Sequence, residues 1–139
     1  MKKVVMLLVA MMLLTISCEK EQTLAEFVIG DWESQEIVLG DSPFGTFTAS
    51  IMTNDTYTLT FTLNDGSASL SCPPTKYWID NEKSQIIITE PDFDTDDNQP
   101  PPTGTVIFDV LWTQEGNTMD WTPVDSDNND APVLNWTRK

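Results

Sequence analysis

The sequence predicts an all-β protein whose strands form an antiparallel barrel or a sandwich. Apolar and polar residues alternate with a period of two, most plainly over 56–63, which is the pattern of a strand with one buried face. Turn residues separate such segments at intervals of about 8 to 14 residues, the spacing of a small all-β domain. No amphipathic helical pattern of useful length follows Gly30.

The chain begins with a short apolar segment that ends at a cysteine. Met1-Lys2-Lys3 is followed by the apolar stretch Val4 to Ile16, then by Ser17 and Cys18. That stretch is shorter than the roughly 20 residues that a membrane-spanning helix needs. The arrangement resembles the signal of bacterial lipoproteins, in which the cysteine becomes the lipidated N-terminus. Thr15 stands where that pattern usually has Leu, as in the looser signals of Bacteroidetes lipoproteins.

This resemblance implies that residues 1–17 are a signal peptide and that residues 24–139 are the folded domain. Residues 18–23 would then be a tether that carries acyl chains such as palmitate on Cys18. The alternatives are a membrane-spanning anchor and a signal cleaved elsewhere, which would leave Cys18 unmodified. We expect a cell-envelope protein held on the outer membrane by lipid. Glu19, Lys20 and Glu21 resemble a surface-export signal, which favours the cell surface over the periplasmic face, although a solvated tether would have the same composition.

The mature chain is strongly acidic. Residues 1–17 contain Lys2, Lys3 and no acid, so their removal leaves five Lys and Arg against 22 Asp and Glu, a net charge of −17. Nucleic acid is excluded as a partner because its phosphates need basic neutralisation. The chain also lacks a polybasic patch for anionic lipid, so the membrane contact is expected from the acyl anchor. A protein partner is left open.

The composition argues against an enzyme. The chain contains no histidine, which excludes Ser-His-Asp and Cys-His catalysis and removes the usual zinc ligands. A hydrolase that uses two carboxylates is the remaining enzymatic alternative, and it is the least favoured because the acids cluster in loops. We expect no cofactor. Cys72 has no disulfide partner once Cys18 is lipidated, and we expect it to be a buried thiol.

The elements follow in order along the mature chain. Thr23 begins a short helical turn over Leu24–Phe27, with Glu26 placed as in a capping box. The segment 56–63 directs Tyr57, Leu59, Phe61 and Leu63 to one face and threonines to the other, and Asn64-Asp65-Gly66 then predicts a hairpin. We expect strands over Asp31–Leu39, Thr46–Thr53, Thr56–Leu63, Ser67–Cys72, Thr75–Asp80, Gln85–Glu90, Thr105–Thr113, Thr118–Pro123 and Val133–Thr137.

Short motifs along the domain resemble a known family. Gly30-Asp31-Trp32 opens the first strand as the Gly-x-Trp motif does in lipocalins. The segments that match in order after it are Thr58–Gly66, Tyr77–Asn81, Ile86–Thr89, Met119–Thr122 and Leu134–Arg138. Over residues 24–138 the chain is similar to the lipocalin-like domains of small Bacteroidetes lipoproteins. The resemblance implies an antiparallel up-and-down barrel of about eight strands.

The same resemblance implies which residues form the base of the barrel. Gly30 and Trp32 would lie at the closed end, with Arg138 stacked across the Trp32 ring in a cation–π contact. The alternative for Arg138 is a frayed, solvated terminus.

The resemblance also implies non-enzymatic binding of a small apolar ligand inside the barrel. The residues expected to bind it are Tyr57, Leu59, Phe61, Phe108, Trp112 and Trp121, and further inward residues are Ile86, Ile88, Val110 and Met119. All of them would serve equally as the core of a filled barrel, so the alternative is a structural or interaction module without a small-molecule ligand. A cavity above roughly 300 Å³ would favour the ligand. Trp78 and Trp136 are expected at the rim or on the outer face.

Two acidic stretches offer several carboxylates within one loop, as calcium sites do. They are Asp92–Asn98 and Asp125–Asp130. The first has Asp97 where an EF-hand has glycine and Thr103 where it has the bidentate glutamate, and the second is too short. We therefore expect hydrated loops and no metal site.

Overall fold

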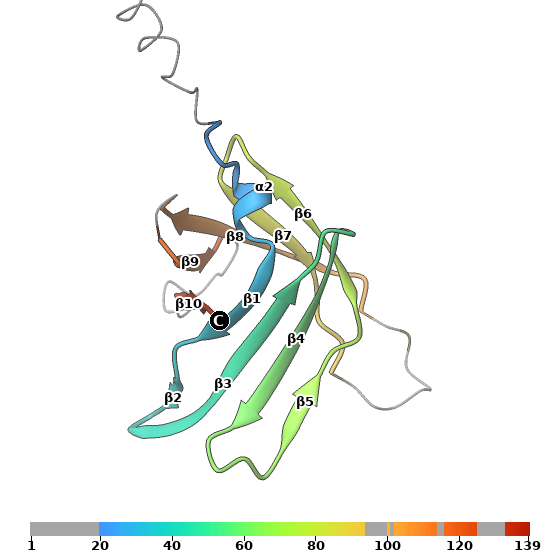
Figure 1. The fold of residues 1–139 in the computed structure, drawn as a ribbon. Helices are drawn as coiled ribbons and strands as arrows, with labels where there is room; N and C mark the ends of the chain where they lie inside the picture. The colour runs from blue at the N-terminus through green and yellow to red at the C-terminus, as the bar shows by residue number, and fades with distance from the viewer. Residues whose placement is uncertain (1–19, 94–99, 101, 114–115, 125–132) are drawn as a thin grey trace, which may run out of the picture.

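The computed structural model describes residues 20–93, 100, 102–113, 116–124 and 133–139. This part of the chain forms one four-residue helix and antiparallel strands (Figure 1). The elements are α2 (Leu24–Phe27), β1 (Gly30–Ser34), β2 (Ile37–Leu39), β3 (Ser42–Ile51), β4 (Thr56–Leu63), β5 (Ser69–Ser71), β6 (Thr75–Asp80), β7 (Gln85–Thr89), β8 (Thr105–Trp112), β9 (Thr118–Pro123) and β10 (Leu134–Arg138). Within the described residues no helix has the length and apolar character to cross a membrane.

Eight of the strands close into an up-and-down barrel. The strands β1, β3, β4, β6, β7, β8, β9 and β10 each pair antiparallel with the next in that order, and β10 pairs with β1. Closure leaves the ring without a free sheet edge. The expected all-β, antiparallel up-and-down barrel is therefore confirmed, and the sandwich is excluded.

Two short strands add to the ring at its margin. β2 pairs with the first residues of β3, and β5 pairs with Thr60–Thr62 of β4. The β4–β5 hairpin is the one predicted from the turn at Asn64-Asp65-Gly66. The pairing between β4 and β6 is short: Thr56 pairs with Lys76, and Tyr57 pairs with Thr75.

The first strand differs from its prediction as a single segment, Asp31–Leu39. It is broken after Ser34, whose buried Oγ accepts a hydrogen bond from the Phe47 N–H at 2.9 Å and donates one to the Gln35 carbonyl at 2.8 Å. A side chain thus replaces the backbone partner at this point of the ladder. The chain resumes pairing as β2, with a register shift between Ile37 and Val38.

The helix α2 lies across one end of the barrel, which we call the closed end (Figure 1). Its capping box forms as predicted, with the Glu26 N–H donating to Thr23 Oγ1 and the Thr23 N–H donating to the Glu26 carboxylate. The Ala25 N–H also donates to Asn81 Oδ1 at 3.1 Å, which joins α2 to the β6–β7 turn. The opposite end, which we call the open end, is the end of the barrel at which β1, β4, β7 and β9 finish.

The interior is one continuous apolar core. Cys72 is 3 % exposed and accepts the Leu59 N–H at its sulfur, so the expectation of a buried thiol is confirmed. Trp78 is 48 % exposed, as expected, but the placement of Trp136 at the rim or outer face was wrong. Trp136 is 1 % exposed because its strand pairs it with the inward-facing Ser34.

Candidate ligand-binding cavity

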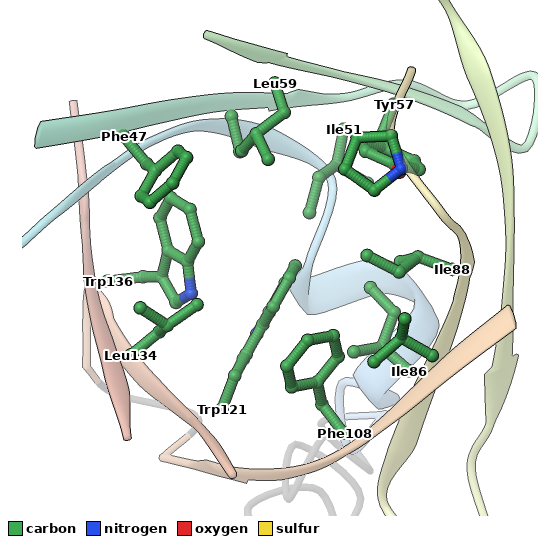
Figure 2. Close-up of a pocket in the computed structure, with 13 residues that line it drawn as sticks. Phe47, Ile51, Tyr57, Leu59, Ile86, Ile88, Phe108, Trp121, Leu134 and Trp136 are labelled. Atoms are coloured by element: carbon green, nitrogen blue, oxygen red, sulfur yellow. The ribbon is translucent and has the colours of Figure 1, made fainter. Parts of the chain in front are cut away.

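The barrel encloses an apolar cavity of about 150 Å³. Side chains from six strands and one loop surround it, and Figure 2 shows them arranged as a ring around an unfilled centre. The lining residues are Phe47, Ala49, Ile51, Tyr57, Leu59, Ile86, Ile88, Pro91, Val106, Phe108, Trp121, Leu134 and Trp136. None of them carries a formal charge, so the cavity suits an apolar molecule.

Tyr57 is the only lining residue with a hydroxyl group. Its O–H donates to the Thr89 carbonyl at 2.5 Å, which ties β4 to β7 beside the short β4–β6 seam. Burial raises the pKa of Tyr57 far above its ordinary value of 10.0, and the neighbouring Cys72 adds to the shift. The side chain therefore stays neutral and presents an aromatic face to the cavity.

Three aromatic rings form one wall. The rings of Phe108 and Trp121 lie 5.3 Å apart between centroids, and those of Trp121 and Trp136 lie 5.1 Å apart. The Trp121 indole N–H donates to Met119 Sδ at 3.2 Å. Tilted rings at these separations attract one another beyond the area that they bury.

The indole N–H of Trp136 has no hydrogen-bond partner among the described residues. An indole nitrogen can only donate, and leaving a buried donor unpaired costs about 1–3 kcal/mol. Figure 2 shows Trp136 between Phe47 and Leu134, with its nitrogen on the side of the ring turned toward the interior. The wall thus contains one buried hydrogen-bond donor that has no acceptor among the described residues.

The structure places four of the six predicted ligand residues around the cavity: Tyr57, Leu59, Phe108 and Trp121. Phe61 does not line it, although its side chain points inward. It lies nearer the open end, with its ring centroid 5.4 Å from that of Phe44 and 4.9 Å from that of Phe47.

Trp112 does not line the cavity either. Its ring packs against Phe27 of α2, with 4.7 Å between centroids, so it lies at the closed end. Of the further inward residues, Ile86 and Ile88 line the cavity, whereas Val110 and Met119 are buried outside its lining.

Several lining residues escaped the sequence prediction. Phe47, Ala49 and Ile51 follow the period-two alternation of β3, so the pattern was present in the sequence but was hidden by small polar neighbours. Pro91 carries no such signal, because it lies in the loop after β7 and reaches the cavity only through the tertiary fold.

The closed end is held by Arg138. Its guanidinium carbon lies 4.3 Å from the centroid of the Trp32 ring and 5.3 Å from that of Phe27. The same group donates hydrogen bonds to the carbonyls of Ile29 at 2.8 Å and Phe27 at 2.6 Å. The stacking implied by the resemblance is present, and Arg138 is not a frayed terminus.

Gly30 and Trp32 complete this arrangement. Gly30 has φ of +140°, and a Cβ built there would lie 2.6 Å from Arg138 Nη1. Trp32 is fully buried and donates its indole N–H to the Val28 carbonyl at 2.7 Å. Packed side chains therefore fill the base of the barrel.

Three sequence predictions fall outside the described residues. Cys18 is one, and most of both acidic stretches, including Asp94–Asp97 and Asp125–Asp130, are the others. Among the residues that the structure describes, no group of three or more Cys, Asp or Glu side chains is arranged to hold a metal ion.

Comparison with known proteins adds no relative: no family model, no curated protein and no solved structure matches this chain significantly.

Proposed function

We propose that this protein is a non-enzymatic, lipid-anchored binding protein of the cell envelope, which holds a small apolar ligand in its barrel. The observation that carries the proposal is the cavity itself, which has an apolar lining inside the closed barrel. A well-packed interior of this size would have few voids larger than a water molecule.

The volume limits what the cavity can take. At about 150 Å³ it is smaller than the roughly 300–1,000 Å³ of pockets that enclose drug-sized ligands. Apolar cavities of about 150 Å³ in other proteins stay dry and bind benzene or xenon. The ligand is therefore a benzene-sized group, or a larger molecule that inserts only one end.

Benzene provides a direct test. We expect the parent protein to melt at a higher temperature when benzene is present, because a ligand that binds only the folded state stabilises it by mass action. Leu59→Phe fills part of the cavity and should abolish the shift. Leu111→Phe is the matched control, since Leu111 is 72 % exposed on the outer face of β8.

An unshifted parent protein would count against the ligand proposal. If Leu59→Phe proves unstable, Ala49→Leu adds volume to the same cavity from β3. An equal shift in the parent, Leu59→Phe and Leu111→Phe would place benzene elsewhere on the protein and contradict the assignment of the cavity.

A second candidate is an interaction module whose barrel is in effect filled. The small volume favours it, as do the large apolar side chains exposed at the open end, among them Leu39 at 58 % and Leu70 at 50 %. An absent benzene shift together with a stable complex with another envelope protein would select this candidate.

The anchor is proposed from the sequence around Cys18 and from the polar tether that leads to α2. Mass spectrometry of the protein from its native membrane should show acyl mass on the parent and none on Cys18→Ala. An unmodified parent would contradict the anchor. We propose display on the outer surface of the outer membrane, and digestion of intact cells by an added protease checks this, because a periplasmic protein would survive.

A further inference from the structure

Three tryptophan side chains are buried in the described part of the barrel, and two of them have an acceptor for the indole N–H. Trp32 donates to the Val28 carbonyl at 2.7 Å. Trp121 donates to Met119 Sδ at 3.2 Å. Trp136 is just as deeply buried, at 1 % exposed, but its indole N–H has no acceptor among the described residues. Buried polar groups in folded proteins are almost always hydrogen-bonded, so this exception calls for an explanation.

The side chains beside Trp136 offer it no strong acceptor. Its cross-strand partner Ser34 has a buried hydroxyl group, which already accepts the Phe47 N–H and donates to the Gln35 carbonyl. The Trp121 ring, whose centroid lies 5.1 Å from that of Trp136, can present only an aromatic face. Such a face is a weaker acceptor than an oxygen or nitrogen atom.

This N–H belongs to the wall of the apolar cavity. Trp136 lines the cavity, and Figure 2 shows its nitrogen on the edge of the ring that faces the interior. Because the side chain is buried, an acceptor can reach it only from inside the barrel. Water is poorly suited, since a buried water needs about two to four polar partners. The other polar side-chain groups of the lining, those of Tyr57 and Trp121, are already bonded to the protein.

The rest of the lining favours an aromatic ring. Five of the thirteen lining residues are aromatic: Phe47, Tyr57, Phe108, Trp121 and Trp136. Aromatic rings attract one another through their quadrupoles, beyond the area that they bury. The volume of about 150 Å³ matches a single ring, as in other apolar cavities of this size. An aromatic ring therefore gains more from this wall than an alkyl group of equal size.

We propose that the group bound in the cavity is an uncharged aromatic ring with one hydrogen-bond acceptor, which accepts the N–H of Trp136. The acceptor is a ring nitrogen, or a carbonyl or ether oxygen on the ring. This rests on the proposed function and names the chemical class of its ligand. The aromatic wall accounts for the ring, and the unpaired donor accounts for the acceptor. Trp136 thereby selects among apolar molecules of one size.

Pyridine and benzene test the proposal, because they have nearly the same size and differ in one ring nitrogen. Both are titrated into the protein in mildly alkaline buffer, where pyridine is uncharged. Water solvates pyridine better than benzene, so the measured quantity is the ratio of the two affinities. We expect the affinity for pyridine relative to benzene to fall about tenfold in Trp136→Phe, because the ring nitrogen is then buried without a partner.

Trp121→Phe is the matched control. It makes the same substitution in the same wall, but the N–H that it removes is bonded to Met119. It should change both affinities by similar factors, so the ratio stays close to that of the parent. An equal fall of the ratio in both variants would reflect the loss of an indole ring in general and would overturn the role of the Trp136 N–H.

Nuclear magnetic resonance of the parent protein gives a test that does not depend on the folding of a variant. The indole N–H resonance of Trp136 should move downfield when pyridine binds, because its proton becomes hydrogen-bonded. Benzene should move it much less, since only the ring current of the ligand acts on it. Equal movement with both ligands would overturn the proposal.

The outcomes separate this inference from the proposed function. Benzene binding with the same affinity ratio in the parent and in Trp136→Phe would uphold the cavity and overturn the acceptor. Pyridine binding that survives in Leu59→Phe would lie outside the cavity and would also overturn it. Failure of both molecules to bind the parent would overturn the proposed function itself.

Discussion

At the scale of single residues, Arg138 of β10 joins α2, the segment after it and β1. It stacks on Trp32 of β1 and Phe27 of α2, and it satisfies carbonyls of Phe27 and Ile29 that follow the helix. Hydrogen bonds from a charged donor are about twice as strong as neutral ones. A side chain of β10 thereby fixes α2 and β1 in place.

Gly30→Ala should destabilise the protein by about 2–4 kcal/mol, because it adds a strained backbone conformation to a steric conflict with Arg138. Gly66→Ala is the control, since Gly66 also has positive φ, +69°, but no atom lies within 4 Å of the added Cβ. Denaturant unfolding should show a loss of about 1 kcal/mol for the control. Equal losses would mean that the contact with Arg138 contributes nothing.

The two tyrosines predict the behaviour of the protein in alkali. Burial raises the pKa of Tyr57 and of Tyr77, and their hydroxyl groups donate to the carbonyls of Thr89 and Met52. A folded pKa above the unfolded value of 10.0 means that the stabilisation is complete below pH 10 and is lost as pH rises further. Phenolate absorbance should therefore rise at a higher pH in the folded protein than in the unfolded chain.

Tyr57→Phe/Tyr77→Phe is the matched variant for this prediction. It should be less stable at neutral pH, by about 1 kcal/mol per lost hydrogen bond, and its stability should fall less steeply above pH 10. Ordinary titration of both tyrosines in the folded parent near pH 10 would contradict the prediction.

At the scale of elements, α2 is too short to be stable alone, and its caps and contacts define it. Thr23→Ala removes the side-chain acceptor of the Glu26 N–H and should cost about 1 kcal/mol. Thr23→Ser keeps the acceptor and should unfold at nearly the parent's denaturant concentration. A parent-like Thr23→Ala would show that the burial of Leu24 and Phe27 alone holds the helix.

The strands show what could be predicted from the sequence. β6 and β9 have the predicted bounds, because turn residues and alternation both mark their ends. The break after Ser34 was not predictable, since it depends on a hydroxyl that replaces a backbone partner of Phe47. Trp136 was misplaced because alternation in a five-residue strand does not show which face is buried.

The residues that line the cavity were likewise predictable only in part. Tyr57, Leu59, Phe108 and Trp121 were found because they alternate on long strands. Phe61 and Trp112 alternate equally well, yet they lie beyond the two ends of the cavity. Alternation identifies the inner face of a strand, whereas height along the barrel axis depends on how the strands are staggered, and no single strand encodes that.

At the scale of the whole molecule, the net charge of residues 18–139, −17, should govern the response to ions. Self-repulsion destabilises the compact state and is screened by salt, so the melting temperature should rise with potassium chloride. Calcium chloride at equal ionic strength should add little if the acidic loops are hydrated. A much larger rise at millimolar calcium would show a specific site in Asp92–Asn98 or Asp125–Asp130.

The position of the tether fixes which way the barrel would stand on a membrane. Lys20 Nζ lies 2.9 Å from a Glu26 carboxylate oxygen, so Lys20, two residues after Cys18 in the sequence, lies close to α2. Two residues span at most about 7 Å. An acyl anchor at Cys18 would thus hold the closed end next to the lipid and turn the open end toward the surrounding fluid. Ligand would then be exchanged with the aqueous phase, and the protein would collect dissolved molecules rather than extract them from the bilayer beneath it.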